Sequence, residues 1–109
     1  DIEFIDLVSY VNFLKMQYHS KFIISDSGTS QEEACLLGTP VIVPRDFTER
    51  PESMEHNCSY LLNVNKISSC GDSLQYVDSI CKGEKTMDVT WLGDGMTSTS
   101  IINILENFL

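Results

Sequence analysis

Residues 22–33 read Phe-Ile-Ile-Ser-Asp-Ser-Gly-Thr-Ser-Gln-Glu-Glu, which is an apolar run, a turn of small residues and a helix-forming segment in succession. This order predicts a buried strand that leads through a glycine turn into a helix N-terminus. The first N–H groups of a helix lack intrahelical partners, and the aligned peptide dipoles favour negative charge there. The stretch therefore predicts a site for a phosphate or another anion.

Apolar periodicity and turn residues extend this pattern in both directions. Apolar side chains recur at three- and four-residue steps from Phe4 to Tyr18, which predicts an amphipathic helix over that segment. Ser30 and Glu33 have the spacing of a capping box, with Gly38 as the C-terminal stop of a helix from Ser30 to Leu37. The further predicted elements are a strand over 41–43, a short helix from 51 toward 55, a strand over 60–64, a weak helix over 74–81 and an amphipathic helix over 96–109.

Strands that alternate with helices predict an α/β fold, namely a Rossmann-like parallel sheet with flanking helices. Ligands in such sheets bind outside the carboxyl ends of the strands, which is where the glycine turn falls. Three or four strands are few for a doubly wound domain. We therefore expect residues 1–109, which begin with Asp1 rather than Met, to form an incomplete domain of a longer protein.

Composition excludes several function classes. Seven basic and sixteen acidic residues leave a net charge of −9, which argues against nucleic acid or an anionic membrane as the partner. No apolar run approaches the roughly 20 residues of a membrane span, so we expect a soluble, cytoplasmic protein. The four cysteines lack zinc-ligand spacing, and we expect them to be reduced and structural, with no metal or cofactor.

Three stretches together resemble one known family. Residues 26–34 read Asp-Ser-Gly-Thr-Ser-Gln-Glu-Glu-Ala, residues 37–41 read Leu-Gly-Thr-Pro-Val, and residues 45–52 read Arg-Asp-Phe-Thr-Glu-Arg-Pro-Glu. In order and spacing they are similar to the UDP-N-acetylglucosamine 2-epimerase family, as is Gly93-Asp94-Gly95 followed by an isoleucine-rich helix. The resemblance covers the C-terminal part of the family's second domain.

The resemblance implies two Rossmann-like domains that face each other, as in glycosyltransferase-B proteins, with UDP held by the C-terminal one. It implies a UDP-sugar substrate, an N-terminal domain outside this chain and a homodimer. The residues that match UDP-binding positions are Phe13 near the uracil, Ser27, Gly28 and Thr29 around the diphosphate, Glu33 at the ribose, and Arg50 at the nucleotide. Thr29 departs from the family's commonest motif, which has glycine there, and looks more like the branch that acts on diacetamido or 6-deoxy sugars in capsule and O-antigen synthesis. The Gln-Glu-Glu of residues 31–33 and the Thr-Glu-Arg-Pro-Glu of residues 48–52 look more like the N-acetylglucosamine branch, so the resemblance leaves the sugar of this cell-surface polysaccharide precursor open.

Each of these residues also has a simpler structural explanation. Glu33 could only cap the helix, Arg50 could only pair with Glu49 or Glu52, and Phe13 could be a core residue. The resemblance favours ligand binding for all three. Glu32 is expected to be a solvated first-turn acid, and Arg45 to pair with Asp46.

The family inverts the sugar at C2 by expelling UDP and adding it back, and its proton-transferring residues lie upstream of this chain. No pair of acids here has a spacing typical of tuned general acid–base catalysis. We therefore expect no catalytic residue in the chain and no epimerase activity from it alone. The alternatives are an epimerase for another UDP-acetamido sugar, a glycosyltransferase of the same fold, and a non-catalytic interaction module.

Overall fold

The computed structural model describes residues 1–109 and centres on a three-stranded parallel sheet. Its strands are β1 (Ile23–Ile24), β2 (Val41–Val43) and β3 (Ser59–Leu61), in the order β1-β2-β3. Ile23 pairs with Val41, and Val41 pairs in turn with Ser59. The predicted α/β class with a parallel sheet is confirmed, although β3 is shorter than the strand expected over 60–64.

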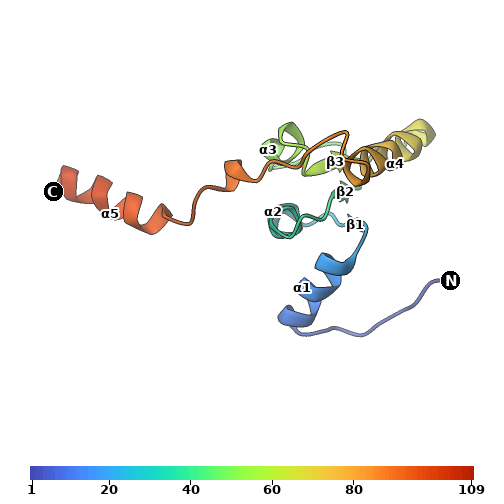
Figure 1. Ribbon diagram of the computed structural model, residues 1–109, viewed down its shortest axis with the longest axis horizontal. Coiled ribbons are helices and arrows are strands. Elements are labelled where there is room, and N and C mark those ends of the chain that lie inside the picture. Colours follow the sequence, from blue (N-terminus) through green and yellow to red (C-terminus); the bar gives the residue numbers. More distant parts are fainter.

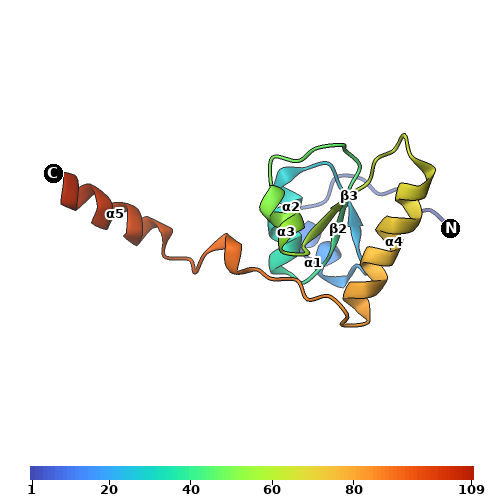
Figure 2. The ribbon, with the colours of Figure 1, turned by 90° about the horizontal axis from the view of Figure 1, so that it is seen from above.

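Helices cover both faces of this sheet, as Figure 2 shows. On one face α2 (Gly28–Leu36) packs Ala34 against Val41 and Val43. On the other face α4 (Ile67–Cys81) packs Tyr76 and Val77 against Ile42. A strand buried on both faces is continuously apolar, which is why β2 reads Val-Ile-Val.

The first helix, α1 (Tyr10–His19), is shorter than the one expected from Phe4 to Tyr18. It begins after Ser9, whose hydroxyl accepts a hydrogen bond from the Asn12 N–H. Phe4 and Leu7 are almost fully exposed in the extended segment before it. Helical periodicity stabilises a helix mainly when its apolar face is buried, and the apolar side chains of Phe4 and Leu7 are not buried against any other element.

The chain after α4 leaves the sheet and runs outward (Figure 1). A 3₁₀ turn (Thr90–Leu92) leads to α5 (Thr97–Phe108), which stands away from the other elements with its isoleucines exposed. The radius of gyration is therefore 16.4 Å, against about 13 Å for a compact domain of this length. None of the helices has the length and apolar character that crossing a membrane requires.

Of two further helices, α4 differs from the sequence-based expectation and α3 agrees with it. The helix expected over 74–81 begins seven residues earlier, at Ile67, although this serine- and glycine-rich turn has weak helix propensity. Ser69 is buried there, and its hydroxyl accepts a hydrogen bond from the Asn63 N–H at 2.9 Å, which ties this turn to the preceding loop. The short α3 (Pro51–Glu55) lies where it was predicted and has proline at its first position.

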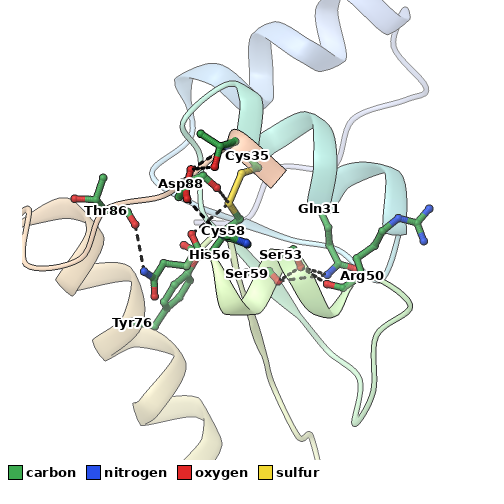
Figure 3. The surroundings of a disulfide bond; sticks show 12 residues. Gln31, Cys35, Arg50, Ser53, His56, Cys58, Ser59, Tyr76, Thr86 and Asp88 are labelled. Carbon is green, nitrogen blue, oxygen red and sulfur yellow. Dashed lines mark hydrogen bonds and ion pairs between the residues drawn. A yellow bond between two sulfur atoms is a disulfide. The ribbon is translucent and has the colours of Figure 1, made fainter. Parts of the chain in front are cut away.

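The prediction of reduced cysteines is wrong for two of the four. Cys35 in α2 and Cys58 before β3 form a disulfide, with Cα atoms 5.4 Å apart (Figure 3). Their separation of 23 positions in the sequence gave no indication of this, because only the packing of α2 beside the start of β3 brings the two together. Cys70 and Cys81 are free and exposed.

Candidate functional site

The N-terminus of α2 follows the carboxyl end of β1, where a ligand site was predicted. Ser27 is the N-cap residue, but its hydroxyl makes no capping hydrogen bond. The helix begins at Gly28, two residues earlier than expected, so Ser30 lies inside it and is buried. The predicted capping box between Ser30 and Glu33 is therefore wrong, and the first-turn amides of the helix have no intrahelical acceptors.

Arg50 lies directly against Gly28. A Cβ atom placed on Gly28 would be 3.2 Å from Arg50 Cζ, 3.3 Å from Nη1 and 3.4 Å from Nη2, so the flat face of the guanidinium covers the glycine. The backbone of Gly28 is not in the left-handed region, where Gly38 and Gly93 lie. Its role is thus to let the arginine approach, and we call Ser27, Gly28, Thr29 and Arg50 the Gly28–Arg50 corner.

Acidic side chains orient this guanidinium. Arg50 Nε donates to Glu32 Oε1 at 2.7 Å, and Nη1 lies 3.8 Å from Glu49 Oε2. Glu32 is therefore not the solvated acid that the sequence suggested, because the loop after β2 brings Arg50 back to α2. Arg45 likewise pairs with Asp26 at 3.6 Å rather than with Asp46.

A buried polar network underlies the corner (Figure 3). The Gln31 amide nitrogen donates to Ser53 Oγ at 2.8 Å and to Ser59 Oγ at 3.3 Å. Its oxygen accepts from Thr48 Oγ1 at 3.0 Å, and that hydroxyl accepts from the Arg50 N–H. Sequence reasoning missed this network. The signals available were a glutamine within the predicted helix and small hydroxyl residues in the loop after β2, in α3 and in β3.

Glu33 lies farther along α2 and faces α1. Tyr10 donates its hydroxyl hydrogen to Glu33 Oε1 at 2.9 Å. This hydrogen bond, with desolvation and the nearby negative charge, raises the pKa of Tyr10 above its ordinary value. Tyr10 was not singled out from the sequence, although it precedes Phe13 by three residues and so shares its helix face.

Phe13 is 43% exposed, so it is not a core residue. It lines a pocket of about 430 Å³ together with residues of β1 and with Ser30 of α2. The Phe13 ring of α1 and the first turn of α2 therefore line the same cavity. Gln17 also lines it, and its buried amide has no hydrogen-bond partner.

The six residues singled out from the sequence therefore fall into two groups. Ser27, Gly28, Thr29 and Arg50 lie together at one helix end, whereas Phe13 and Glu33 lie between α1 and α2. The first group offers unpaired amides and a fixed positive charge, which suits an anion such as a phosphate. The second offers an aromatic face and a carboxylate, which suit the less charged parts of a ligand.

His56 and Asp88 form a separate polar contact on the far side of α3. His56 Nδ1 and Asp88 Oδ2 lie 3.1 Å apart, and the His56 ring stacks on Trp91. Hydrogen bonds from the hydroxyl and N–H of Thr90 lower the pKa of Asp88. No three His, Cys, Asp or Glu side chains gather closely enough to hold one metal ion.

Comparison with known proteins identifies relatives along almost the whole chain. The sequence model of the family described as UDP-N-acetylglucosamine 2-epimerase matches residues 1–106. An epimerase of that name from Campylobacter jejuni is 38% identical over 106 residues, and one from Methanococcus maripaludis is 35% identical over 104. These matches cover 96% and 95% of this chain but only 28% and 27% of the relatives.

Solved structures give the same result. The UDP-GlcNAc 2-epimerase of Methanocaldococcus jannaschii matches with a TM-score of 0.70 and 31% identity, over 94% of this chain and 27% of that one. A Neisseria meningitidis epimerase bound to UDP-GlcNAc matches with a TM-score of 0.61 and 29% identity, over 94% of this chain and 28% of that one. The chain thus spans little more than a quarter of these proteins, and it belongs to the UDP-N-acetylglucosamine 2-epimerase family.

Proposed function

We propose that this chain is the UDP-binding part of a UDP-N-acetylglucosamine 2-epimerase, with the Gly28–Arg50 corner as its diphosphate site. The observation that carries the proposal is the guanidinium of Arg50 lying on Gly28, at the end of a helix whose first amides are unpaired. Two kinds of donor then converge on one small region, as recognition of a diphosphate requires. A relative solved with UDP-GlcNAc bound supports this ligand class.

The nucleoside would extend from the corner toward α1. The carboxylate of Glu33 can accept hydrogen bonds from the two ribose hydroxyls, as acidic residues do in dinucleotide-binding folds. Phe13 presents a partly exposed ring beside the pocket next to the first turn of α2, where a uracil can stack. Tyr10 already occupies one oxygen of Glu33, which leaves the other for the ribose.

The corner would act in catalysis by stabilising a leaving group. Epimerisation by elimination and re-addition of UDP places growing negative charge on the departing diphosphate. Preorganised amides and a guanidinium directed at that charge lower the barrier, and they need not exchange protons. The proton-transferring groups would come from residues outside this chain, so we propose that the chain alone does not epimerise.

Three other functions remain as alternatives to this proposal. The threonine at position 29 favours an epimerase for a diacetamido or 6-deoxy UDP-sugar as the second candidate. A glycosyltransferase and a non-catalytic interaction module are the remaining alternatives. We further propose that the full-length protein is cytoplasmic and forms a homodimer, and that an N-terminal domain closes over the UDP-sugar.

Calorimetric titration of the chain with UDP tests the site. We expect binding, and we expect Arg50→Ala to weaken it roughly 10- to 100-fold, because a charge-assisted contact to the diphosphate is lost. Arg45→Ala is the matched control, since it removes the same charge from the same loop without touching Gly28. No UDP binding, or equal losses in both variants, would contradict the proposed site.

The proposal that the chain alone does not epimerise is tested by incubating it with UDP-N-acetylglucosamine in deuterated water. The chain alone is expected to leave the C2 hydrogen unexchanged. Exchange catalysed by the chain would show that it contains the proton-transferring groups after all.

A further inference from the structure

Gln31 is nearly fully buried, at 2% exposure, although glutamine is usually a surface residue. All the hydrogen bonds of its side-chain amide go to hydroxyl groups: Thr48 on its oxygen, Ser53 and Ser59 on its nitrogen. The first lies in the loop after β2, the second in α3 and the third in β3. One amide on α2 thus connects three segments that follow it in the chain.

Two of these hydroxyls hold the main chain of Arg50. Thr48 Oγ1 accepts the Arg50 N–H at 3.0 Å, and Ser53 Oγ donates to the Arg50 carbonyl oxygen at 2.7 Å. The hydroxyl of Thr48 donates in turn to Gln31 Oε1, and that of Ser53 accepts from Gln31 Nε2. The peptide groups on both sides of the Arg50 Cα are therefore fixed relative to the Gln31 amide.

The geometry points to Gln31 as a positioning residue that sets Arg50 over Gly28, an inference that rests on the proposed function. Gln31 and Gly28 lie on the same helix, three residues apart, so the network fixes the arginine relative to the helix end whose amides it supplements. Glu32, the next residue, orients the guanidinium through the 2.7 Å bond to Nε. Main chain and side chain of Arg50 are thus both held from α2.

Such placement matters because a donor must be held within a fraction of an ångström of its productive position relative to the charge it stabilises. A long arginine side chain on a loop would otherwise lose rotamer freedom when the ligand binds. With the network intact, much of that ordering has occurred before the ligand arrives, which favours binding.

A purely structural role for Gln31, joining α2 to α3 and β3, is the competing explanation. A double-mutant cycle separates the two roles, because a positioning residue acts through Arg50 and a structural one does not. The conservative test variant is Thr48→Val, which keeps the side-chain shape but removes the link between Gln31 and the Arg50 N–H. Gln31→Leu is the direct variant, and it removes all three hydrogen bonds of the Gln31 amide.

UDP affinity and urea unfolding are measured for each variant of the chain, with and without Arg50→Ala. With Arg50 present, Thr48→Val and Gln31→Leu are expected to weaken UDP binding roughly three- to tenfold, and Thr48→Ser to restore it. With Arg50→Ala present, neither variant should weaken binding further. Ser73→Ala, which removes the hydrogen bond from the buried Ser73 hydroxyl to the Cys70 carbonyl oxygen in α4, is the control and should leave UDP affinity unchanged.

The outcomes are distinguishable even if Gln31→Leu does not fold, because Thr48→Val lies on a partly exposed loop and tests the same link. Equal losses with and without Arg50, or no loss with Arg50 present, would overturn the inference and leave the diphosphate site standing. UDP binding that is absent, or unaffected by Arg50→Ala, would overturn the proposed site and the inference together.

Discussion

The two helices that cover the sheet, α2 and α4, differ in what they bury. Helix α4 presents Tyr76 and Val77 to Ile42, and the Tyr76 hydroxyl reaches the Asn57 carbonyl oxygen at 2.9 Å. Burial raises the pKa of Tyr76 well above its ordinary value. Helix α2 contributes Ala34 to the core, but it also buries Ser30 and Gln31. Helix α4 buries two serines as well, but their hydroxyls bond only to the main chain of α4 and of the loop just before it. The Gln31 amide of α2 instead bonds to side chains of three other segments.

This difference follows from what each helix does. Apolar contacts are non-directional and stabilise a fold without specifying atomic positions closely. Hydrogen bonds have preferred distances and angles, so a network such as that of Gln31 holds its members in defined places. We infer that the α4 face supplies stability and the α2 face supplies the geometry of the site.

The largest expected effect is on the α4 face. Ile42→Ala should lower the free energy of unfolding by about 2–5 kcal/mol, because it leaves a cavity beneath Tyr76 and Val77. Ile42→Val, the matched control, should cost about 0.5–1.5 kcal/mol. Urea unfolding measures both, and UDP affinity of the folded Ile42→Val protein should match the wild type. Weaker UDP binding by Ile42→Val would contradict the inference that the α4 face contributes stability but not the geometry of the site.

A glycine in each helix sharpens the comparison. An added methyl group at Gly28 meets the Arg50 guanidinium, so Gly28→Ala should weaken UDP binding roughly three- to tenfold by displacing it. Gly71, in the second turn of α4, has no atom within 4 Å of an added Cβ. Gly71→Ala should instead raise the free energy of unfolding by about 0.5–1 kcal/mol, with unchanged UDP affinity. Unchanged UDP affinity in Gly28→Ala, or weaker UDP binding in Gly71→Ala, would show that the approach of Arg50 to Gly28 does not matter for UDP binding.

The smallest effect is expected where the chain after α4 returns to α3. The pKa of Asp88 is lowered from its ordinary value of 3.8, so its charged form stabilises the fold above that pH, and this stabilisation disappears as pH falls through the lowered pKa. Asp88→Asn should therefore reduce the melting temperature slightly at neutral pH, and the difference should vanish in acid. Thermal melts across pH measure it; a difference that grows in acid would contradict the assigned hydrogen bonds from Thr90.

Much of the fold was predictable because its determinants are local. Continuous apolar runs bounded by glycine and proline predicted β1 and β2, and proline at the first position predicted α3. The helix expected from Phe4 was too long, since periodicity does not show whether a partner surface exists. The helix expected from residue 74 was too short, since helix propensity does not include contacts outside the helix, such as the hydrogen bond from the Asn63 N–H to the Ser69 hydroxyl.

The residues of the proposed site could be singled out from the sequence, but their contacts could not. The motif identified Ser27, Gly28, Thr29 and Arg50, and these residues do lie together in the structure. The partners were missed: Glu32 for Arg50, Tyr10 for Glu33, and Gln31 for the loop that carries Arg50. Each partner lies 17 or more residues away in the chain from the group it contacts, so no local spacing rule includes it.

The amino-acid sequence by itself determined the alternation of strands and helices and the family, because both depend on the type and order of neighbouring residues. Tertiary structure decided which acid holds Arg50, which cysteines meet, and that Gly28 is small so that a guanidinium can lie on it. These contacts join segments brought together only when α2, α3 and β3 pack, and hydrogen bonds and ion pairs depend on distances that packing alone sets.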